Sequence, residues 1–117
     1  IQELLQTGGK IFNGGDPIPY PALAAGCVGC VWGSVNFLPD ESVTLYQLVS
    51  SGQLNEAASL WCKLVDSQLF VWSHQYNASV KAAARHRGFD VGDCRLPVLP
   101  LSEADLSALH ASLASIS

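Results

Sequence analysis

The feature that most constrains the fold is a pair of short apolar runs that flank a helical segment near the start of the chain. The runs cover residues 10–13 and 28–32, and residues 20–25 between them carry a helical pattern that ends at Gly26. The glycine-rich loop Gly14-Gly15-Asp16-Pro17 directly follows the first run. A strand, a helix and a strand joined by such short connections predict a parallel α/β sheet.

From residue 39 onward the apolar residues recur with helical spacing. We expect helices there over residues 40–51, 53–72 and 77–86, and Asp40 is the expected N-cap of the helix over residues 40–51. A short helix over residues 1–6 is expected at the start of the chain. Ser102-Glu-Ala-Asp105 resembles a capping box and predicts the start of a last helix. Residues 95–101 contain two prolines, so this segment is expected to be extended.

Composition and charge exclude several classes of protein. Hydrophobic residues make up 49% of the chain and charged residues 14%, and disordered chains have the opposite balance. The net charge of −4 has the wrong sign for a nucleic-acid surface. The longest uncharged stretch, residues 17–39, carries four prolines and three glycines and cannot form one spanning helix. Because no basic region opens the chain, we expect a cytoplasmic protein without a membrane or nucleic-acid partner.

The four cysteines raise the question of a metal or redox site. Cys27 and Cys30 form a C-x-x-C, a spacing typical of zinc binding or thiol chemistry. Zinc needs two more ligands, and Cys62 and Cys94 each stand alone. The pair also lies in an apolar run and not at the start of a helix, where a thiol pKa is lowered. We therefore expect small buried thiols and no metal, with metal or redox chemistry as the alternative.

Five short motifs follow one another in order along almost the whole chain. They are Asn13-Gly-Gly-Asp16; Gly26-Cys-Val-Gly29 with Val31 and residues 36–39; Ser51-Gly-Gln-Leu-Asn-Glu-Ala57; residues 77–81; and Arg95-Leu-Pro-Val-Leu-Pro-Leu101 preceded by Gly88 and Gly92. In this order they resemble the carboxyl-terminal portion of the dihydrodipicolinate synthase and N-acetylneuraminate lyase family, whose members are Schiff-base aldolases and lyases.

The resemblance implies a (β/α)8 TIM barrel followed by a helical tail. Residues 1–50 would form the last two βα units, with strands seven and eight, and residues 51–117 the carboxyl-terminal helical extension. A complete barrel takes about 250 residues, so the other strands would lie outside this chain. Elements made to face those strands would leave apolar surface exposed, which agrees with the low share of charged residues.

The resemblance also implies a reaction. In the family, a lysine on the sixth strand forms an imine with pyruvate or another 2-oxo acid, and the imine acts as an electron sink. That lysine would lie outside this chain, because Lys10 is only six residues before Asp16 and is expected to be a solvated strand end. No cofactor is implied, and a homo-oligomer completed by the remaining barrel segment is expected. The alternative is a non-catalytic fragment that only packs or oligomerises.

The chain would retain one wall of the substrate site, at the carboxyl ends of the strands. Gly14, Gly15 and Asp16 would meet the variable, hydroxyl-bearing side of the substrate, since glycines permit close approach and a carboxylate accepts hydroxyl hydrogens. Val31 matches a position whose carbonyl faces the lysine in the family, and Trp32 replaces a residue that is usually small. The alternatives are a turn-forming role for Asp16 and ordinary packing for Trp32.

The remaining polar side chains carry weaker signals. The three histidines have no cysteine or acidic partner at ligand spacing and are expected to lie on the surface or to pack. Lys81 matches a structural position of the family, and with Arg85 and Arg87 it predicts a solvated basic helix face. Arg95 is expected to hold the proline-containing tail on the barrel by hydrogen bonds to carbonyl groups.

Overall fold

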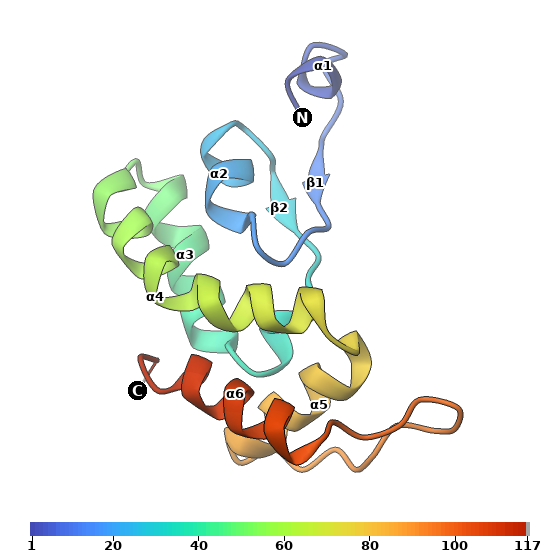
Figure 1. Ribbon diagram of the computed structural model, residues 1–117. Helices are drawn as coiled ribbons and strands as arrows, with labels where there is room; N and C mark the ends of the chain where they lie inside the picture. Colours follow the sequence, from blue (N-terminus) through green and yellow to red (C-terminus); the bar gives the residue numbers. More distant parts are fainter. Residues whose placement is uncertain (117) are drawn as a thin grey trace.

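The computed structural model describes residues 1–116, and helices dominate it (Figure 1). The elements are α1 (Gln2–Leu5), β1 (Phe12–Asn13), α2 (Pro19–Ala24), β2 (Gly29–Cys30), the 3₁₀ helix η1 (Gly33–Asn36), α3 (Pro39–Ser50), α4 (Leu54–Ser73), α5 (Tyr76–His86) and α6 (Glu103–Leu113). The predicted order of strand, helix, strand and then helices is confirmed.

The two strands form a parallel sheet, as predicted. Phe12 lies opposite Gly29 and Asn13 opposite Cys30. The ladder continues beyond the assigned strand ends, because the Val31 amide donates to the Asn13 carbonyl oxygen over 2.8 Å. Within residues 1–116 each strand has only the other as its sheet neighbour, and both strands are shorter than the apolar runs that predict them.

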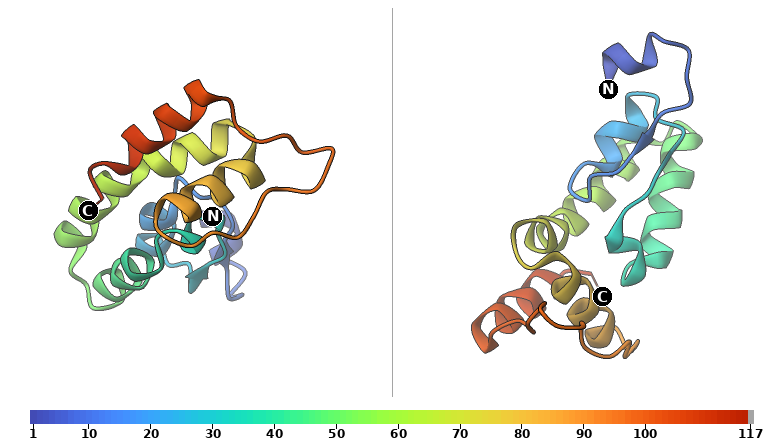
Figure 2. Two further views of the ribbon diagram at one scale, coloured as in Figure 1. Left: turned by 90° about the horizontal axis from the view of Figure 1, so that it is seen from below. Right: turned by 90° about the vertical axis from the view of Figure 1, so that its right-hand side faces the viewer.

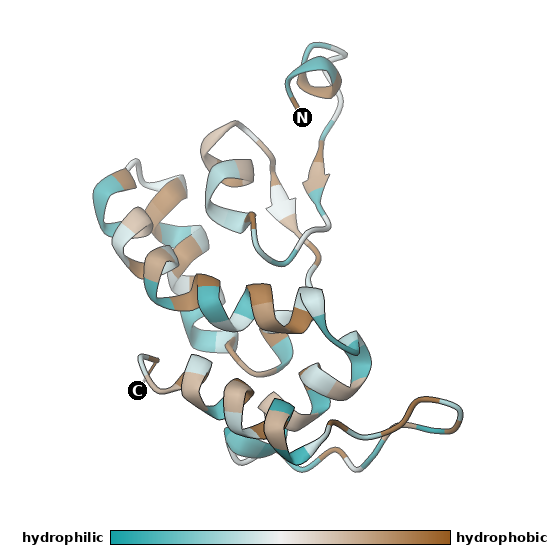
Figure 3. Cartoon of the chain, viewed as in Figure 1, coloured by the Kyte–Doolittle hydropathy of each residue, from teal (hydrophilic) through white to brown (hydrophobic). Residues whose placement is uncertain are grey.

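The Phe12 ring lies across the second strand at Gly29. A Cβ atom at residue 29 would be 2.8 Å from Cε1 of the Phe12 ring, closer than side chains tolerate. Glycine at this position therefore permits the close contact between the strands. The ring is nevertheless 59% exposed, and Figure 3 shows β1, which has an apolar and a hydrophilic part, at the border of the molecule.

The hydrophobic core lies among α4, α5 and α6, away from the sheet. Figures 1 and 2 show α6 alongside both of the other helices. Within residues 1–116 this core cluster has ten buried side chains, which are Phe37, Leu38, Leu64, Phe70, Val71, Ala83, Ala84, Leu109, Leu113 and Ile116. Each large apolar side chain among them contributes about 1.5–3 kcal/mol by burial. No helix within residues 1–116 is long and apolar enough to cross a membrane.

The helix starts show one confirmed cap and one wrong one. The Ser102 hydroxyl accepts a hydrogen bond from the Asp105 amide over 3.1 Å at the start of α6, which confirms Ser102 as the N-cap of the last helix; the same hydroxyl donates to the Asp105 carboxylate over 2.8 Å. The prediction for Asp40 is wrong, because Leu38 is the N-cap of α3 and makes no side-chain cap bond. Pro39 takes the first helical position, where its fixed φ and missing N–H suit the helix, and this moves Asp40 into the first turn.

The segment that joins α5 to α6 projects from the helices as a long loop (Figure 2). Its prolines exclude a helix, as predicted, but residues 95–101 are not extended throughout. The Val98 amide donates to the Arg95 carbonyl oxygen over 3.1 Å and closes a turn. Leu96 and Leu99 on this loop are 83% and 63% exposed. The division of the chain at residue 50 stays a prediction.

Candidate functional site at the strand ends

The parallel pairing of β1 and β2 places the carboxyl ends of both strands at the same edge of the sheet. Residues 14–18 follow β1 there, and residues 31–36 follow β2. In α/β folds these ends carry the ligand and catalytic groups. All five residues predicted to form the substrate wall lie in these two segments.

The Asn13 side chain shapes the loop after β1. Its Oδ1 accepts from the Gly15 amide over 3.1 Å, and its Nδ2 donates to the Gly15 carbonyl oxygen over 2.8 Å. Asn13 is 6% exposed, whereas Gly14 at the tip of the loop is exposed, with no atom within 4 Å of where a Cβ would lie. The loop therefore exposes its backbone at Gly14, while the hydrogen bonds of the buried Asn13 side chain fix its shape.

Asp16 is fully buried, with 0% of its surface exposed. Its Oδ2 accepts from the Ser34 hydroxyl over 2.5 Å and from the Ser34 amide over 2.9 Å. Its Oδ1 accepts from the Gly33 amide over 3.2 Å and from the Tyr76 hydroxyl over 2.9 Å. These four donors replace the hydrogen bonds to water that the Asp16 carboxyl group loses on burial.

Tyr76, the first residue of α5, brings the helical tail to the strand ends. Its hydroxyl accepts from the Gly33 amide over 2.9 Å while it donates to Asp16. Burial, followed by the hydrogen bond to Asp16, raises the pKa of this hydroxyl above its usual value. Sequence reasoning missed Tyr76, because no local pattern connects it to a loop 60 residues earlier.

Gly33 provides the room that this arrangement needs. A Cβ atom there would lie 2.8 Å from Cζ of Tyr76 and 3.1 Å from its Cε1. Any side chain at residue 33 would therefore displace the ring and both of its hydrogen bonds. The glycine is required for this contact and not for an unusual backbone angle, because its φ is not positive.

Val31 and Trp32 lie between the sheet and η1. Val31 is 72% exposed, and Trp32 is partly buried in an extended backbone conformation with φ −140° and ψ 152°. Trp32 borders an open cleft of about 420 Å³, which Phe12, Val43 and Tyr46 also line. Both residues therefore offer surface beside the strand ends, whereas Asp16 offers none.

The comparisons with known proteins agree with this fold. The sequence model of the Dihydrodipicolinate synthetase family matches residues 1–116.

The chain belongs to the dihydrodipicolinate synthetase family.

Individual members of the dihydrodipicolinate synthetase family are similar to the chain over most of its length. An uncharacterized DapA-like lyase from Halobacterium salinarum is 34% identical over 103 residues, which are 88% of this chain and 34% of that protein. A 4-hydroxy-tetrahydrodipicolinate synthase from Brachyspira hyodysenteriae is 31% identical over 80% of this chain. Dihydrodipicolinate synthase DapA-2 from Bacillus anthracis matches the structure with a TM-score of 0.83 and 29% identity, over 91% of this chain and 36% of that one. The chain thus spans about a third of the length of these relatives.

The four cysteines are free thiols, and the prediction of buried thiols is confirmed for Cys27 only, because Cys30 and Cys94 are partly buried and Cys62 is exposed. Cys27 is buried just before β2, and Cys30 within β2 is partly buried. Burial raises the pKa of the Cys30 thiol to about 11, so it stays protonated at neutral pH. Within residues 1–116, no three His, Cys, Asp or Glu side chains come together in a group that could hold a metal ion.

The basic side chains of the tail have structural partners. Lys81 donates to the carbonyl oxygens of Val91 and Asp93 over 3.3 and 3.0 Å, and Arg85 contacts the carboxylates of Asp90 and Asp93 at 3.0 Å. The prediction of a solvated face is confirmed for Arg85, which is exposed, although Arg85 and Lys81 also hold the segment that follows α5. Lys10 is also exposed, as predicted. Within residues 1–116 the Arg95 guanidinium donates no hydrogen bond to a carbonyl group, so its predicted role stays a prediction.

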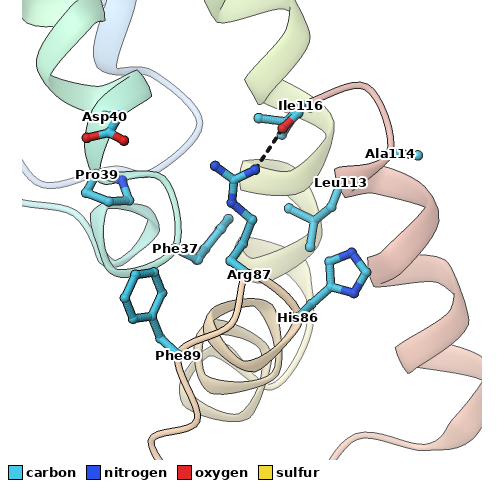
Figure 4. Close-up of a pocket in the computed structure, with 9 residues that line it drawn as sticks. All are labelled: Phe37, Pro39, Asp40, His86, Arg87, Phe89, Leu113, Ala114 and Ile116. Atoms are coloured by element: carbon cyan, nitrogen blue, oxygen red, sulfur yellow. Dashed lines mark hydrogen bonds between the residues drawn. The ribbon is translucent and has the colours of Figure 1, made fainter.

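A second cleft, of about 440 Å³, lies between the start of α3, the end of α5 and the last turn of the chain (Figure 4). Arg87 projects into it, but its guanidinium is 2.7 Å from a Glu41 carboxylate oxygen and donates to the Ile116 carbonyl oxygen over 2.8 Å. The lining includes none of the predicted wall residues. The Arg87 cation in this cleft is thus already paired, and the strand ends remain the candidate site. The histidines also pack: His86 stacks on His110, and His74 on Phe70.

Proposed function

We propose that this chain is the carboxyl-terminal part of a pyruvate-dependent class I aldolase or lyase of the dihydrodipicolinate synthetase family. In this proposal β1 and β2 are strands seven and eight of a (β/α)8 barrel, and residues 51–117 are its helical extension. The lysine that forms the imine with pyruvate or another 2-oxo acid lies on the remaining barrel segment, in the same polypeptide or in a second one. No further cofactor is needed, because the imine itself accepts the electron pair of the broken bond.

The open side of the sheet is the observation that carries this proposal. Parallel strands are normally covered on both faces, yet Phe12 and Val31 are 59% and 72% exposed. Val43 and Tyr46 on α3 are also 55% and 46% exposed, beside the same apolar cleft. Neighbouring strands of a barrel would cover these side chains, and a chain that spans a third of its relatives leaves room for them.

The substrate wall then consists of the accessible residues at the strand ends. Gly14 and Gly15 bring the backbone of the loop after β1 close to the substrate, and Val31 presents its carbonyl towards the lysine. Trp32 closes the pocket with an aromatic surface. The four free cysteines suit a reducing compartment, so we place the complete protein, a homo-oligomer in this proposal, in the cytoplasm.

Trapping of the imine tests the proposed reaction. The chain is incubated with pyruvate and borohydride, which reduces an imine to a stable adduct, in parallel with a longer polypeptide that carries the upstream strands. We expect an adduct on a lysine of the longer polypeptide and none on the 117-residue chain. An adduct on Lys10 would show that the lysine is wrongly placed, and no adduct on either polypeptide would refute the reaction.

A non-catalytic role is the second candidate, and two observations favour it. The tail has a core of its own around α4, α5 and α6, and Leu96 and Leu99 are exposed on the projecting loop. Such a chain would pack against copies of itself or a barrel protein without reacting. Analytical ultracentrifugation distinguishes the two roles: stable self-association together with no adduct on the longer polypeptide supports the non-catalytic role.

A further inference from the structure

We propose that Asp16 is a positioning residue, which holds the segment after β2 in place through η1 and Tyr76 and does not bind substrate hydroxyls. This inference rests on the proposed function for its catalytic consequence, but its structural part is independent of any reaction. The sequence of the glycine-rich loop suggests that Asp16 contacts the substrate directly. The positioning role replaces that role.

The first argument is that the acceptor capacity of Asp16 is already used. A carboxylate offers about four lone-pair sites, and the donors are the Gly33 amide, the Ser34 amide, the Ser34 hydroxyl and the Tyr76 hydroxyl. The residue has no exposed surface. A substrate hydroxyl would have to displace one of these donors and leave it buried without a partner, which is unfavourable.

The second argument is the position of the donors in the chain. Gly33 and Ser34 directly follow Val31 and Trp32, two of the proposed wall residues. The Val31 amide is bonded to the Asn13 carbonyl oxygen, so the wall segment is held at its start by β1 and at its end by Asp16. Asp16 therefore determines where the Val31 carbonyl and the Trp32 ring lie, although it reaches neither of them through a hydrogen bond.

The third argument is the contribution of α5. The Tyr76 hydroxyl joins the Gly33 amide to Asp16, and the rest of α5 packs in the core of the tail through Ala83 and Ala84. The helical tail is thereby a part of the site's support. Within residues 1–116, the accessible side of the wall at Gly14, Val31 and Trp32 offers backbone groups and apolar side chains, whereas the Asp16 carboxylate is buried behind it.

The structural part is tested on the 117-residue chain by amide hydrogen exchange, measured by NMR. In Asp16→Asn one acceptor atom becomes a donor, and we expect the Gly33 or Ser34 amide to exchange about tenfold faster or more. Exchange at Val71 in the α4 core is expected to be unchanged. Asp40→Asn is the matched control, since Asp40 is exposed, and it leaves both amides unchanged.

A milder variant protects this test against simple unfolding. Ser34→Ala removes one donor and keeps both backbone amides, and we expect a roughly threefold acceleration confined to residues 33 and 34. Unchanged exchange at both residues in Asp16→Asn, or in Ser34→Ala if the first variant does not fold, overturns the positioning role. Acceleration limited to these residues supports it.

The catalytic part is tested on the longer polypeptide with pyruvate and two aldehydes, glyceraldehyde and propanal. For a positioning residue, Asp16→Asn lowers kcat at least about tenfold with both aldehydes and leaves the ratio of their kcat/KM values unchanged. A loss confined to glyceraldehyde, through its KM, shows direct binding of hydroxyls and overturns the inference. If the parent polypeptide reacts with neither aldehyde and forms no imine, the proposed function fails, and amide exchange still decides the role of Asp16.

Discussion

The replacement Tyr76→Phe probes the connection between the tail and the strand ends. It removes one oxygen atom and leaves the ring beside Gly33. Two hydrogen bonds are lost, one donated to the Asp16 carboxylate and one accepted from the Gly33 amide, both over 2.9 Å. The Gly33 amide retains Asp16 Oδ1 as an acceptor at 3.2 Å, and Asp16 retains three donors.

The expected loss of stability follows from these bonds. A hydrogen bond to a charged group contributes about 1.5–3 kcal/mol and a neutral one about 0.5–1.5 kcal/mol. Since the Gly33 amide keeps an acceptor, the lower values apply, and we expect the free energy of unfolding to fall by about 2 kcal/mol. With an unfolding entropy of about 2.1 cal/mol/K per residue, this lowers the Tm of a chain of this length by about 8 °C.

Thermal and urea unfolding, followed by circular dichroism, measure this change. Tyr46→Phe is the control, because the Tyr46 hydroxyl is 3.5 Å from its acceptor, the Val28 carbonyl oxygen, and the residue is 46% exposed. We expect the control to lose less than about 0.5 kcal/mol. Equal losses in the two variants would refute the reasoning, because they would show that the Tyr76 hydroxyl contributes no more than an exposed one.

The pH dependence of the same pair has a definite sign. The Tyr76 pKa is raised in the folded chain, so the unfolded chain loses this proton first as the pH rises past about 10. The contribution of the hydroxyl is therefore complete below that pH and is lost as the pH rises through the folded-state pKa. The difference in stability between the native chain and Tyr76→Phe should narrow in alkaline solution, and a difference that widens would contradict this.

Three further predictions address other parts of the chain. Gly33→Ala should destabilise the fold more than the loss of the tyrosine hydroxyl does, because its Cβ displaces the ring, and urea unfolding measures the difference. Ser102→Ala should lower the free energy of unfolding by about 1 kcal/mol, because the N-cap of α6 is lost. Ser107→Ala, a replacement inside the same helix, is the control and should not cause this loss. Equal losses in the two variants would disprove the contribution of the cap. In the folded chain at pH 8.5 an alkylating reagent should modify the exposed Cys62 well before Cys30, whose thiol pKa is about 11; equal rates would show that the Cys30 thiolate is accessible.

The sequence by itself determined the order of the elements and the positions of the longer helices. Helical periodicity identified α4 and α5 to within two residues at each end, and the capping box located the start of α6 at Ser102. These features depend on contacts between residues three or four apart, so local patterns contain the information. Asp40 was misplaced as a cap because Pro39 competes for the start of the same helix, and local rules alone did not rank the two.

The tertiary structure decided what the polar groups at the strand ends do. A carboxylate after two glycines has the same local pattern whether it faces a substrate or the interior. The partners of Asp16 lie 17, 18 and 60 residues further along the chain, and only the packing of α5 against η1 brings Tyr76 to it. Hydrogen bonds over such separations depend on how whole elements are placed, so the buried state of Asp16 followed from the fold and not from its own motif.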